Sequence, residues 1–303
     1  MKRAVSVSIG SSSRDKAVSM ELFGETVHLE RIGTDGDMEK AARLFQELDG
    51  QVDAFGVGGA ILGLLIDRKW YDFHSVMPLV SHVQHTPVAD GTGLKDTLER
   101  QAAVVVEPLL DGMPRRVFHM SAVDRYGLAR GFLDSGYESV FGDLMFALGI
   151  PIAMHSDAAL KRMARMLIPI MTRLPFNWVY PTGEKQNQHT PKFGKFFEWA
   201  TVIAGDCHYI TKYMPHSLEG KIIVTNTTTQ TDRELFKAAG VRYLVTTTPM
   251  LEGRSFGTNM MEASILAAKG WKEPINYANP KDYFQRMTQA VADLGMKPKL
   301  QEL

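Results

Sequence analysis

Charged side chains gather around a glycine turn that opens a predicted helix, in the stretch "ADGTGLKDTLER". Asp90 precedes the turn, and Lys95 and Asp96 follow it. A lysine beside a carboxylate can hold a hydroxyl or carbonyl group and move a proton during hydride transfer. The stretch therefore offers Lys95 as a catalytic proton-transfer group, with Asp90 or Asp96 as the acid that orients it. The spacing is equally typical of a solvated helix cap.

A second stretch, "SAVDRYG", lies where the phosphate-binding turn of a dinucleotide site would be. The three glycine positions of such a turn fall on Ala122, Asp124 and Gly127, so only the third is kept. A carboxylate at Asp124 disfavours phosphate unless it turns away to cap the helix. If a dinucleotide binds, we expect Ser121, Arg125 and the helix beginning near Gly127 to meet its phosphates. A purely structural βαβ unit is the alternative.

The strand after this turn ends in an acid. Asp143 lies about 20 residues past Ala122, the spacing at which a carboxylate binds a ribose hydroxyl in dinucleotide domains. A negative charge there favours NAD over NADP, whose ribose carries a phosphate.

Two threonine tracts, "TNTTTQTD" and "TTTP", run past the ends of two predicted strands. The carboxyl ends of parallel strands are where open α/β sheets bind ligands, although threonine is also common in strands. We therefore expect cofactor contacts from Thr225, Asn226, Thr227, Thr246 and Thr247.

Another strand ends in "AGDCHYI", which adds Gly205 and Asp206 to the expected cofactor edge. Cys207 and His208 are neighbours and would point to opposite faces of an extended chain, so they do not predict a nucleophile and its base. Cys207 is more typical of a small buried apolar residue. The nine histidines show no HxH or HExxH spacing, so we expect no metal site.

Strands and helices alternate after residue 112, which is typical of a parallel sheet with crossover helices. The fold class expected is α/β, with a Rossmann-like doubly wound sheet preceded by a smaller α/β substrate domain. We expect the substrate domain at 1–112, the nucleotide-binding domain at 113–270, and a C-terminal helix in 271–303 that packs back on the first domain. The six strands expected in the sheet are 116–120, 139–142, 150–154, 200–204, 221–226 and 243–247.

The amino-acid composition limits the classes of binding partner that we expect. The 303 residues include 34 Lys and Arg against 34 Asp and Glu, so no bulk charge suggests nucleic acid or an anionic membrane. The single cysteine suits a cytoplasmic protein, and no apolar run reaches the length of a membrane span. A small-molecule substrate is the partner expected, and a homodimer stays open.

Six segments in order, "ERIGTDGD", "DGTGLKDTLERQA", "SAVDRYGL", "YPTGEKQ", "GKIIVTNTTT" and "YLVTTTPMLEGRSFGTN", carry a resemblance over nearly the whole chain. The chain resembles a bacterial family labelled quinate 5-dehydrogenase, related by that label to shikimate dehydrogenases. The resemblance implies a substrate domain followed by a Rossmann domain and NAD(P)-linked oxidation of an alicyclic hydroxyl. The sequence departs from the shikimate dehydrogenase pattern in its degenerate glycine turn, and Lys95 is the nearest stand-in for the catalytic lysine.

The function expected is therefore an NAD(P)-dependent oxidoreductase that acts on a small polar hydroxy or keto compound, quinate- or shikimate-like. Two alternatives stay open. One is a transferase that uses another adenosine cofactor, such as S-adenosylmethionine, and has no need of Lys95. The other is a non-catalytic sensor that keeps the Rossmann shape and has lost its phosphate turn at Ala122 and Asp124.

Overall fold

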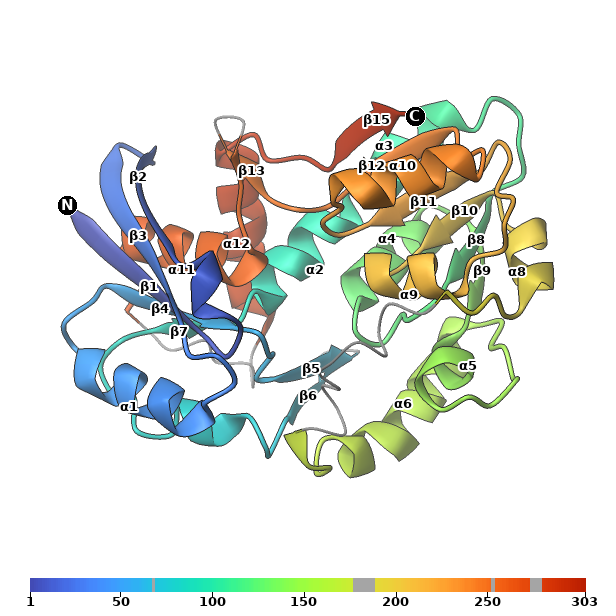
Figure 1. The fold of residues 1–303 in the computed structure, drawn as a ribbon. Coiled ribbons are helices and arrows are strands. Elements are labelled where there is room, and N and C mark those ends of the chain that lie inside the picture. The colour runs from blue at the N-terminus through green and yellow to red at the C-terminus, as the bar shows by residue number, and fades with distance from the viewer. Residues whose placement is uncertain (67–68, 177–188, 252–253, 273–279) are drawn as a thin grey trace. The chain divides into compact units, whose positions relative to one another are not determined.

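The computed structural model describes residues 1–66, 69–176, 189–251, 254–272 and 280–303. The chain divides into two compact units, each assembled from three segments. Unit 1 comprises Met1–Thr97, Leu167–Tyr180 and Pro249–Met296, and unit 2 comprises Leu98–Met166, Pro181–Thr248 and Lys297–Leu303. Both units contain parallel strands and helices, so the fold class is α/β as predicted (Figure 1).

Unit 1 contains a five-stranded sheet in the order β2-β3-β1-β4-β7. β2 and β3 form the predicted antiparallel hairpin, and the other neighbours pair in parallel. The carboxyl ends of the parallel strands therefore meet at one edge. The strands are β1 (Lys2–Ser8), β2 (Lys16–Leu22), β3 (Glu25–Gly33), β4 (Ala54–Gly58) and β7 (Val88–Ala89). Two short antiparallel pairs, β5 (Gly63–Ile66) with β6 (Lys69–Asp72) and β13 (Met250–Leu251) with β14 (Arg254–Ser255), lie outside it.

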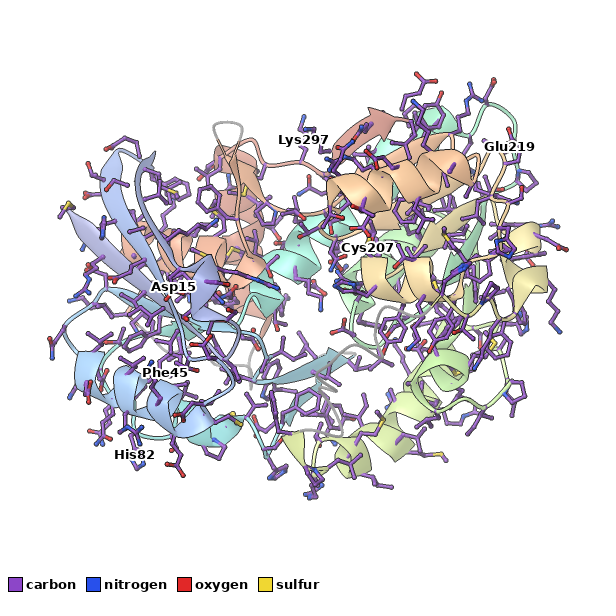
Figure 2. All side chains as sticks on the ribbon, in the orientation of Figure 1. Asp15, Phe45, His82, Cys207, Glu219 and Lys297 are labelled. Atoms are coloured by element: carbon purple, nitrogen blue, oxygen red, sulfur yellow. The ribbon has the colours of Figure 1, made fainter. Side chains whose placement is uncertain are left out.

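Helices α1 (Met38–Leu48), α11 (Thr258–Lys269) and α12 (Pro280–Asp293) belong to unit 1, together with the first turns of α2 (Thr92–Arg100). The side chain of Asp37 caps α1 by accepting the N–H of Lys40 at 2.8 Å, as the acid-rich start of this segment predicts. Phe45 projects from α1 (Figure 2). Its ring packs edge-to-face on Phe55 of β4, with ring centroids 5.1 Å apart. Helix α11 packs against β1 and β4.

Unit 2 contains a six-stranded sheet in the order β15-β12-β11-β10-β8-β9. Five of its strands are parallel, and β15 is antiparallel to β12. The strands are β8 (Arg116–His119), β9 (Glu138–Phe141), β10 (Val202–Ala204), β11 (Ile222–Thr225), β12 (Tyr243–Thr246) and β15 (Lys299–Glu302). Its helices are α3 (Ala102–Val106), α4 (Tyr126–Asp134), α5 (Asp143–Ala147), α8 (Gly194–Trp199), α9 (Cys207–Tyr213) and α10 (Gln230–Ala238). Helix α6 (Asp157–Met171) runs from unit 2 into unit 1, as α2 runs from unit 1 into unit 2.

Five of the six predicted strands of this sheet are confirmed, and the strand expected at 150–154 is wrong. Of those residues only Met154 pairs, in an isolated antiparallel bridge with Phe141. Pro151 has no N–H to donate to a ladder, and the N–H of Ile152 turns back to the carbonyl of Ile150 at 2.7 Å. The sixth place in the sheet is taken by β15, which the sequence pattern did not predict.

The predicted domain boundaries also differ from the two units. Residues 249–270 were expected in the nucleotide-binding domain, yet α11 packs on the sheet of unit 1. The helix covers Thr258–Lys269, and the strand order cannot tell on which sheet a following helix packs. With this segment and α12, unit 1 is no smaller than unit 2.

Candidate functional site

The carboxyl edge of unit 2, made up of residues 120–125, 205–207, 225–228 and 246–248, contains the topological switch point of the sheet. From β8 the chain passes through α4 to β9 on one side, whereas β10 lies on the other side of β8. Open α/β sheets bind ligands in the crevice at such a point. The loop after β8 and the loop after β10 flank this switch point, and they carry Arg125 and Asp206.

Arg125 forms ion pairs with two carboxylates at this point and is 6% exposed. One terminal nitrogen pairs with Glu99, and the other lies 3.1 Å from Oδ2 of Asp206. Burial opposes the charged guanidinium, but the charges of Glu99, Asp206 and Asp124 raise the pKa of Arg125 above its ordinary value. The guanidinium therefore neutralises its neighbours and offers no free fork to a phosphate, which is contrary to the role expected for Arg125.

Asp206 and Asn226 extend the same hydrogen-bond network. Nδ2 of Asn226 donates to Oδ2 of Asp206 at 2.7 Å, and Oδ1 of Asn226 accepts the N–H of Cys207 at 3.1 Å. Oδ1 of Asp206 caps α9 by accepting the N–H of His208 at 3.0 Å. Asp206 and Asn226 thus both lie at the carboxyl edge, where the sequence predicted them, and their side chains are hydrogen-bonded to each other.

The threonine tracts divide into buried and exposed hydroxyls. Thr225 and Thr247 are buried; the hydroxyl of Thr225 donates to Asn226, and that of Thr247 donates to the carbonyl of Thr225 at 3.2 Å. Thr227 is exposed, and its hydroxyl lies 2.8 Å from that of Thr248. Thr227 therefore remains open to a ligand, whereas Thr225 and Thr247 hold the loops together. Thr246 ends β12 and is half-buried.

Gly205 packs closely against Met120 in the loop after β8. A Cβ built on it would lie 3.2 Å from Cβ of Met120. The lack of a side chain at Gly205 is therefore explained by packing between the loops after β8 and β10, and the ligand approach expected there needs no part in it.

Asp143 faces the loop after β8. Its Oδ1 accepts the N–H groups of Ala122 and Val123 at 2.9 and 2.8 Å, and its Oδ2 is buried without a hydrogen-bond partner in the part of the chain that the structure describes. Burial raises the pKa of Asp143 to about 6. This carboxylate holds the turn from inside, where the sequence predicted a contact with ribose.

The first turn of α4 has no side-chain cap. The helix begins at Tyr126, one residue before the predicted start, and the N-cap Arg125 makes no capping bond with its side chain. Gly127 is buried in this turn, and Ser121 is half-buried before it. Ser121 and Gly127 therefore stay candidates for ligand contact.

These residues do not fit the pyrophosphate of a dinucleotide. Asp143 occupies the backbone N–H groups of the turn, Arg125 is engaged, and the charges of Glu99, Asp124 and Asp206 all act on that one guanidinium. An anionic ligand at the loop 121–125 would compete with these carboxylates for the guanidinium and for the N–H groups of Ala122 and Val123. The hydroxyls that remain exposed suit the uncharged parts of a ligand.

Two further buried groups are structural. His119, at the end of β8, stacks on Phe141 with ring centroids 5.3 Å apart, and burial lowers its pKa to about 3, so the ring is neutral. Cys207 is buried as predicted (Figure 2), and burial raises the pKa of its thiol. A neutral thiol is a poor nucleophile, so Cys207 carries no nucleophilic chemistry.

In unit 1 the predicted catalytic residues lie at the start of α2. Asp90 is buried, its Oδ2 accepts the N–H of Leu62 at 2.8 Å, and its Oδ1 accepts the N–H of Thr92 at 2.9 Å. Lys95 and Asp96 follow in the first turns of the helix and are half-buried. The structure therefore places all three on or beside the N-terminal half of one helix.

A second acid, Glu262, lies at this position and was not predicted from the sequence pattern. Glu262 of α11 is fully buried; its Oε2 accepts the N–H of Leu94 at 3.1 Å, and its Oε1 accepts the hydroxyl of Tyr283 from α12. Burial and then the charge of Asp90 raise the pKa of Glu262 to about 8. The signal available in the sequence was one charged residue inside the apolar run "NMMEASILAA", where every neighbour packs into a core.

The described residues contain no group of three or more His, Cys, Asp or Glu side chains placed to hold a metal ion. Among the helices described, none combines the length and the apolar character that crossing a bilayer requires.

The solved structures similar to this chain at low identity include three proteins. The NAD-dependent malic enzyme of Thermotoga maritima shares 14% identity over 97% of this chain and 84% of its own, with a TM-score of 0.39. The malic enzyme of Entamoeba histolytica shares 9% over 87% of this chain and 66% of its own, with a TM-score of 0.35. The arabinose-transporter periplasmic binding protein of Shewanella sp. ANA-3 shares 11% over 97% and 98%, with a TM-score of 0.36. At this level none of the three indicates a function for this chain.

No curated protein matches the chain. Two family models do. Residues 3–90 match the family described as "Domain of unknown function (DUF8753)". Residues 93–303, more than half of the chain, match the family described as "Domain of unknown function (DUF8754)", so this chain belongs to the DUF8754 family.

Proposed function

We propose that this chain is an oxidoreductase that acts on a hydroxyl or keto group of a small polar compound, with proton transfer carried by unit 1. The observation that carries the proposal is the grouping of Asp90, Lys95 and Glu262 around the start of α2. The two carboxyls lie in different environments, since the pKa of Glu262 is raised to about 8 by burial and by the charge of Asp90. A buried carboxyl with a raised pKa beside a second carboxylate is typical of acid–base sites.

In this proposal Lys95 holds the substrate oxygen and moves its proton, and Asp90 orients the lysine from the turn before the helix, with Asp96 as the alternative acid. The resemblance to quinate 5-dehydrogenases supports a quinate- or shikimate-like substrate and NAD(P) as the hydride acceptor. The sequence favoured NAD because Asp143 was expected to bind the ribose. The carboxylate of Asp143 instead accepts the N–H groups of Ala122 and Val123, so the proposal covers NAD and NADP alike. No residue of unit 2 is assigned to the phosphates of the cofactor.

Turnover and binding test the proposal together. We expect NAD or NADP at millimolar concentration to raise the melting temperature, because a ligand that binds only the native state stabilises it by mass action. With quinate or shikimate present, we expect NAD(P) reduction, and Lys95→Ala to lower kcat by about 10²-fold or more with the thermal shift kept. Lys40→Ala, at an exposed position of α1, is the control. No shift with either nucleotide would overturn the proposal.

A second function is favoured by the ion pair between Arg125 and Asp206 at the switch point. A carboxyl edge whose guanidinium is engaged and which lacks a glycine-rich phosphate turn suits a ligand without a pyrophosphate. Such a ligand is expected of a transferase that uses S-adenosylmethionine or of a non-catalytic small-molecule sensor. The same thermal titration separates the candidates. Stabilisation by S-adenosylmethionine or adenosine, with none by NAD or NADP, would select the second.

A further inference from the structure

Glu262 connects three helices of unit 1. It projects from α11 and accepts the N–H groups of Gly93 and Leu94 in the first turn of α2, and it accepts the hydroxyl of Tyr283 from α12. The glutamate is fully buried, and Tyr283 is 5% exposed. A buried carboxyl with these three donors fixes the first turn of α2 against the two other helices.

Two glycines show how tightly this turn is packed. A Cβ on Gly93 would lie 2.4 Å from Cε1 of Tyr283 and 2.7 Å from Oε1 of Glu262. A Cβ on Gly91, whose φ is +92°, would lie 2.6 Å from Oγ1 of Thr258. Only residues without a side chain allow α2 to begin this close to α11 and α12. The carbonyl of Gly91 accepts the N–H of Lys95 at 2.9 Å, so the lysine closes the same turn.

Burial and the charge of Asp90 oppose the ionisation of Glu262. Asp90 stands beside it at the start of α2, and its negative charge adds to the effect of burial in raising the pKa of Glu262. On α12 the hydroxyl of Tyr283 contacts the glutamate, and the charge of Arg286 acts on Tyr283. On α2, Lys95 and Asp96 follow within the next turn. Burial and the charge of Asp90 therefore outweigh the hydrogen bonds from Tyr283, Leu94 and Gly93, and the pKa of Glu262 is raised.

We propose that Glu262 is a positioning residue of the reaction suggested above. While its carboxyl carries a proton, its hydrogen bonds hold the first turn of α2 in place, and with it Asp90 and Lys95. The inference rests on the proposed function for what the turn positions. When the carboxyl releases its proton to solvent, two negative carboxylates stand at one buried turn. Their repulsion loosens the turn, so alkaline pH moves Lys95 out of register.

Backbone NMR tests this without a substrate. With ¹⁵N-glycine and ¹⁵N-leucine labels, we expect the amide signals of Gly93 and Leu94 to titrate with a midpoint near pH 8, because their N–H groups donate to Glu262. Glu262→Gln keeps the shape and removes the titration, and Glu39→Gln, at an exposed position of α1, leaves it in place. Signals of Gly93 and Leu94 that stay unmoved from pH 6 to 9.5 in the wild type would overturn the proposal.

Tyr283→Phe supplies a second variant in case Glu262→Gln does not fold. Its hydroxyl donates to Glu262 and lowers the pKa of that carboxyl, so removing it must shift the titration of Gly93 and Leu94 to higher pH. A midpoint that falls or does not move contradicts the proposal.

The kinetic arm links the turn to the reaction. With quinate or shikimate and NAD(P), we expect the wild-type kcat to fall by about tenfold between pH 7.5 and 9.5. In Glu262→Gln we expect the ratio of kcat at pH 7.5 to kcat at pH 9.5 to be at least about fivefold smaller, and the difference to appear in kcat rather than in KM. An equal ratio in both proteins contradicts the positioning role. If the wild type turns over neither substrate, the proposed function fails, whereas the NMR titration still decides whether Glu262 controls the turn.

Discussion

Arg125 is the residue on which the carboxyl edge of unit 2 depends most, because its guanidinium neutralises the buried Glu99 and the half-buried Asp206. The side chains of Arg125 and Glu99 are 7% and 3% exposed. Removing one member of a buried ion pair leaves the other charge in a medium of low dielectric constant, which costs far more than the pair contributes when it is intact. The network is therefore stable when all of its charged side chains are present, and removing any one of them destabilises the protein.

We expect Arg125→Met to lower the free energy of unfolding by about 3–5 kcal/mol, measured by urea denaturation at pH 7. The matched control is Arg116→Met, which removes an arginine paired with Glu138 on the surface and should cost less than about 1 kcal/mol. A loss for Arg125→Met as small as that of the control would show that the pair is open to solvent, and the edge could then admit a phosphate.

Asp143 provides a pH-dependent test of the turn after β8. Its folded-state pKa is raised from 3.8 to about 6, so the unfolded chain releases this proton at lower pH than the folded chain does. The stability that the protonated carboxyl contributes is present below pH 3.8 and is lost as the pH rises through about 6.

Asp143→Asn stays neutral and can still accept both N–H groups of the turn through Oδ1. We expect its stability relative to wild type to rise between pH 4 and pH 7, by at most about 1.4 kcal/mol per pH unit. Urea denaturation across this range measures the difference. Asp111→Asn, at an exposed position with φ 46° that asparagine also adopts, should show no such rise. A flat difference for Asp143→Asn would mean that water reaches the carboxylate.

At the scale of the elements, the helix starts around the carboxyl edge differ in how they are capped. Asp206 caps α9, and Thr229 with Asp232 forms a capping box on α10, whereas α4 begins without a side-chain cap. Capped termini have their first N–H groups satisfied and offer little to an anion. In the threonine tract before α10, Thr229 serves its own helix, whereas Thr227 remains open to a ligand.

Helix α4 is fixed by a close approach to the end of α2. A Cβ on Gly131 would lie 2.4 Å from the carbonyl oxygen of Arg100, and a backbone atom cannot swing away as a side chain can. We expect Gly131→Ala to destabilise the protein by about 1–3 kcal/mol in urea denaturation, although alanine favours helices more than glycine does. Gly194→Ala in α8, where no atom lies within 4 Å, should be neutral or stabilising. Equal stability of the two variants would place α4 farther from α2.

Local pattern predicted most elements and few of the side-chain partners. The strand and turn residues of β11 and β12 and the bounds of α11 follow from hydrophobic periodicity and from Gly270 at the helix end. The ion pairs of Arg125 join residues 26 and 81 positions apart, and no local spacing reveals such a contact. Glu262 was missed for the same reason, since its partners come from two other helices.

At the scale of the whole molecule, the chain passes between the two units several times. Unit 1 needs Pro249–Met296 to complete it, and unit 2 ends with Lys297–Leu303, which supplies β15. The two family models divide the sequence differently, at residues 90 and 93. The N-terminal family segment therefore lacks α11 and α12, which belong to the same structural unit.

This interleaving predicts that residues 1–92 do not fold alone. Met261 and Ile265 of α11 are fully buried in unit 1, where the helix packs on β1 and β4, so a chain that ends before α2 exposes the apolar face that α11 covers. We expect the 1–92 fragment to melt without a cooperative transition and to bind the dye ANS, as loosely packed chains do. Co-expression with residues 93–303 should restore a sharp transition, because the second fragment supplies α11 and α12. If 1–92 alone melts cooperatively and without dye binding, the sheet of unit 1 is stable without α11, and the family boundary, rather than the structural one, marks the folding unit.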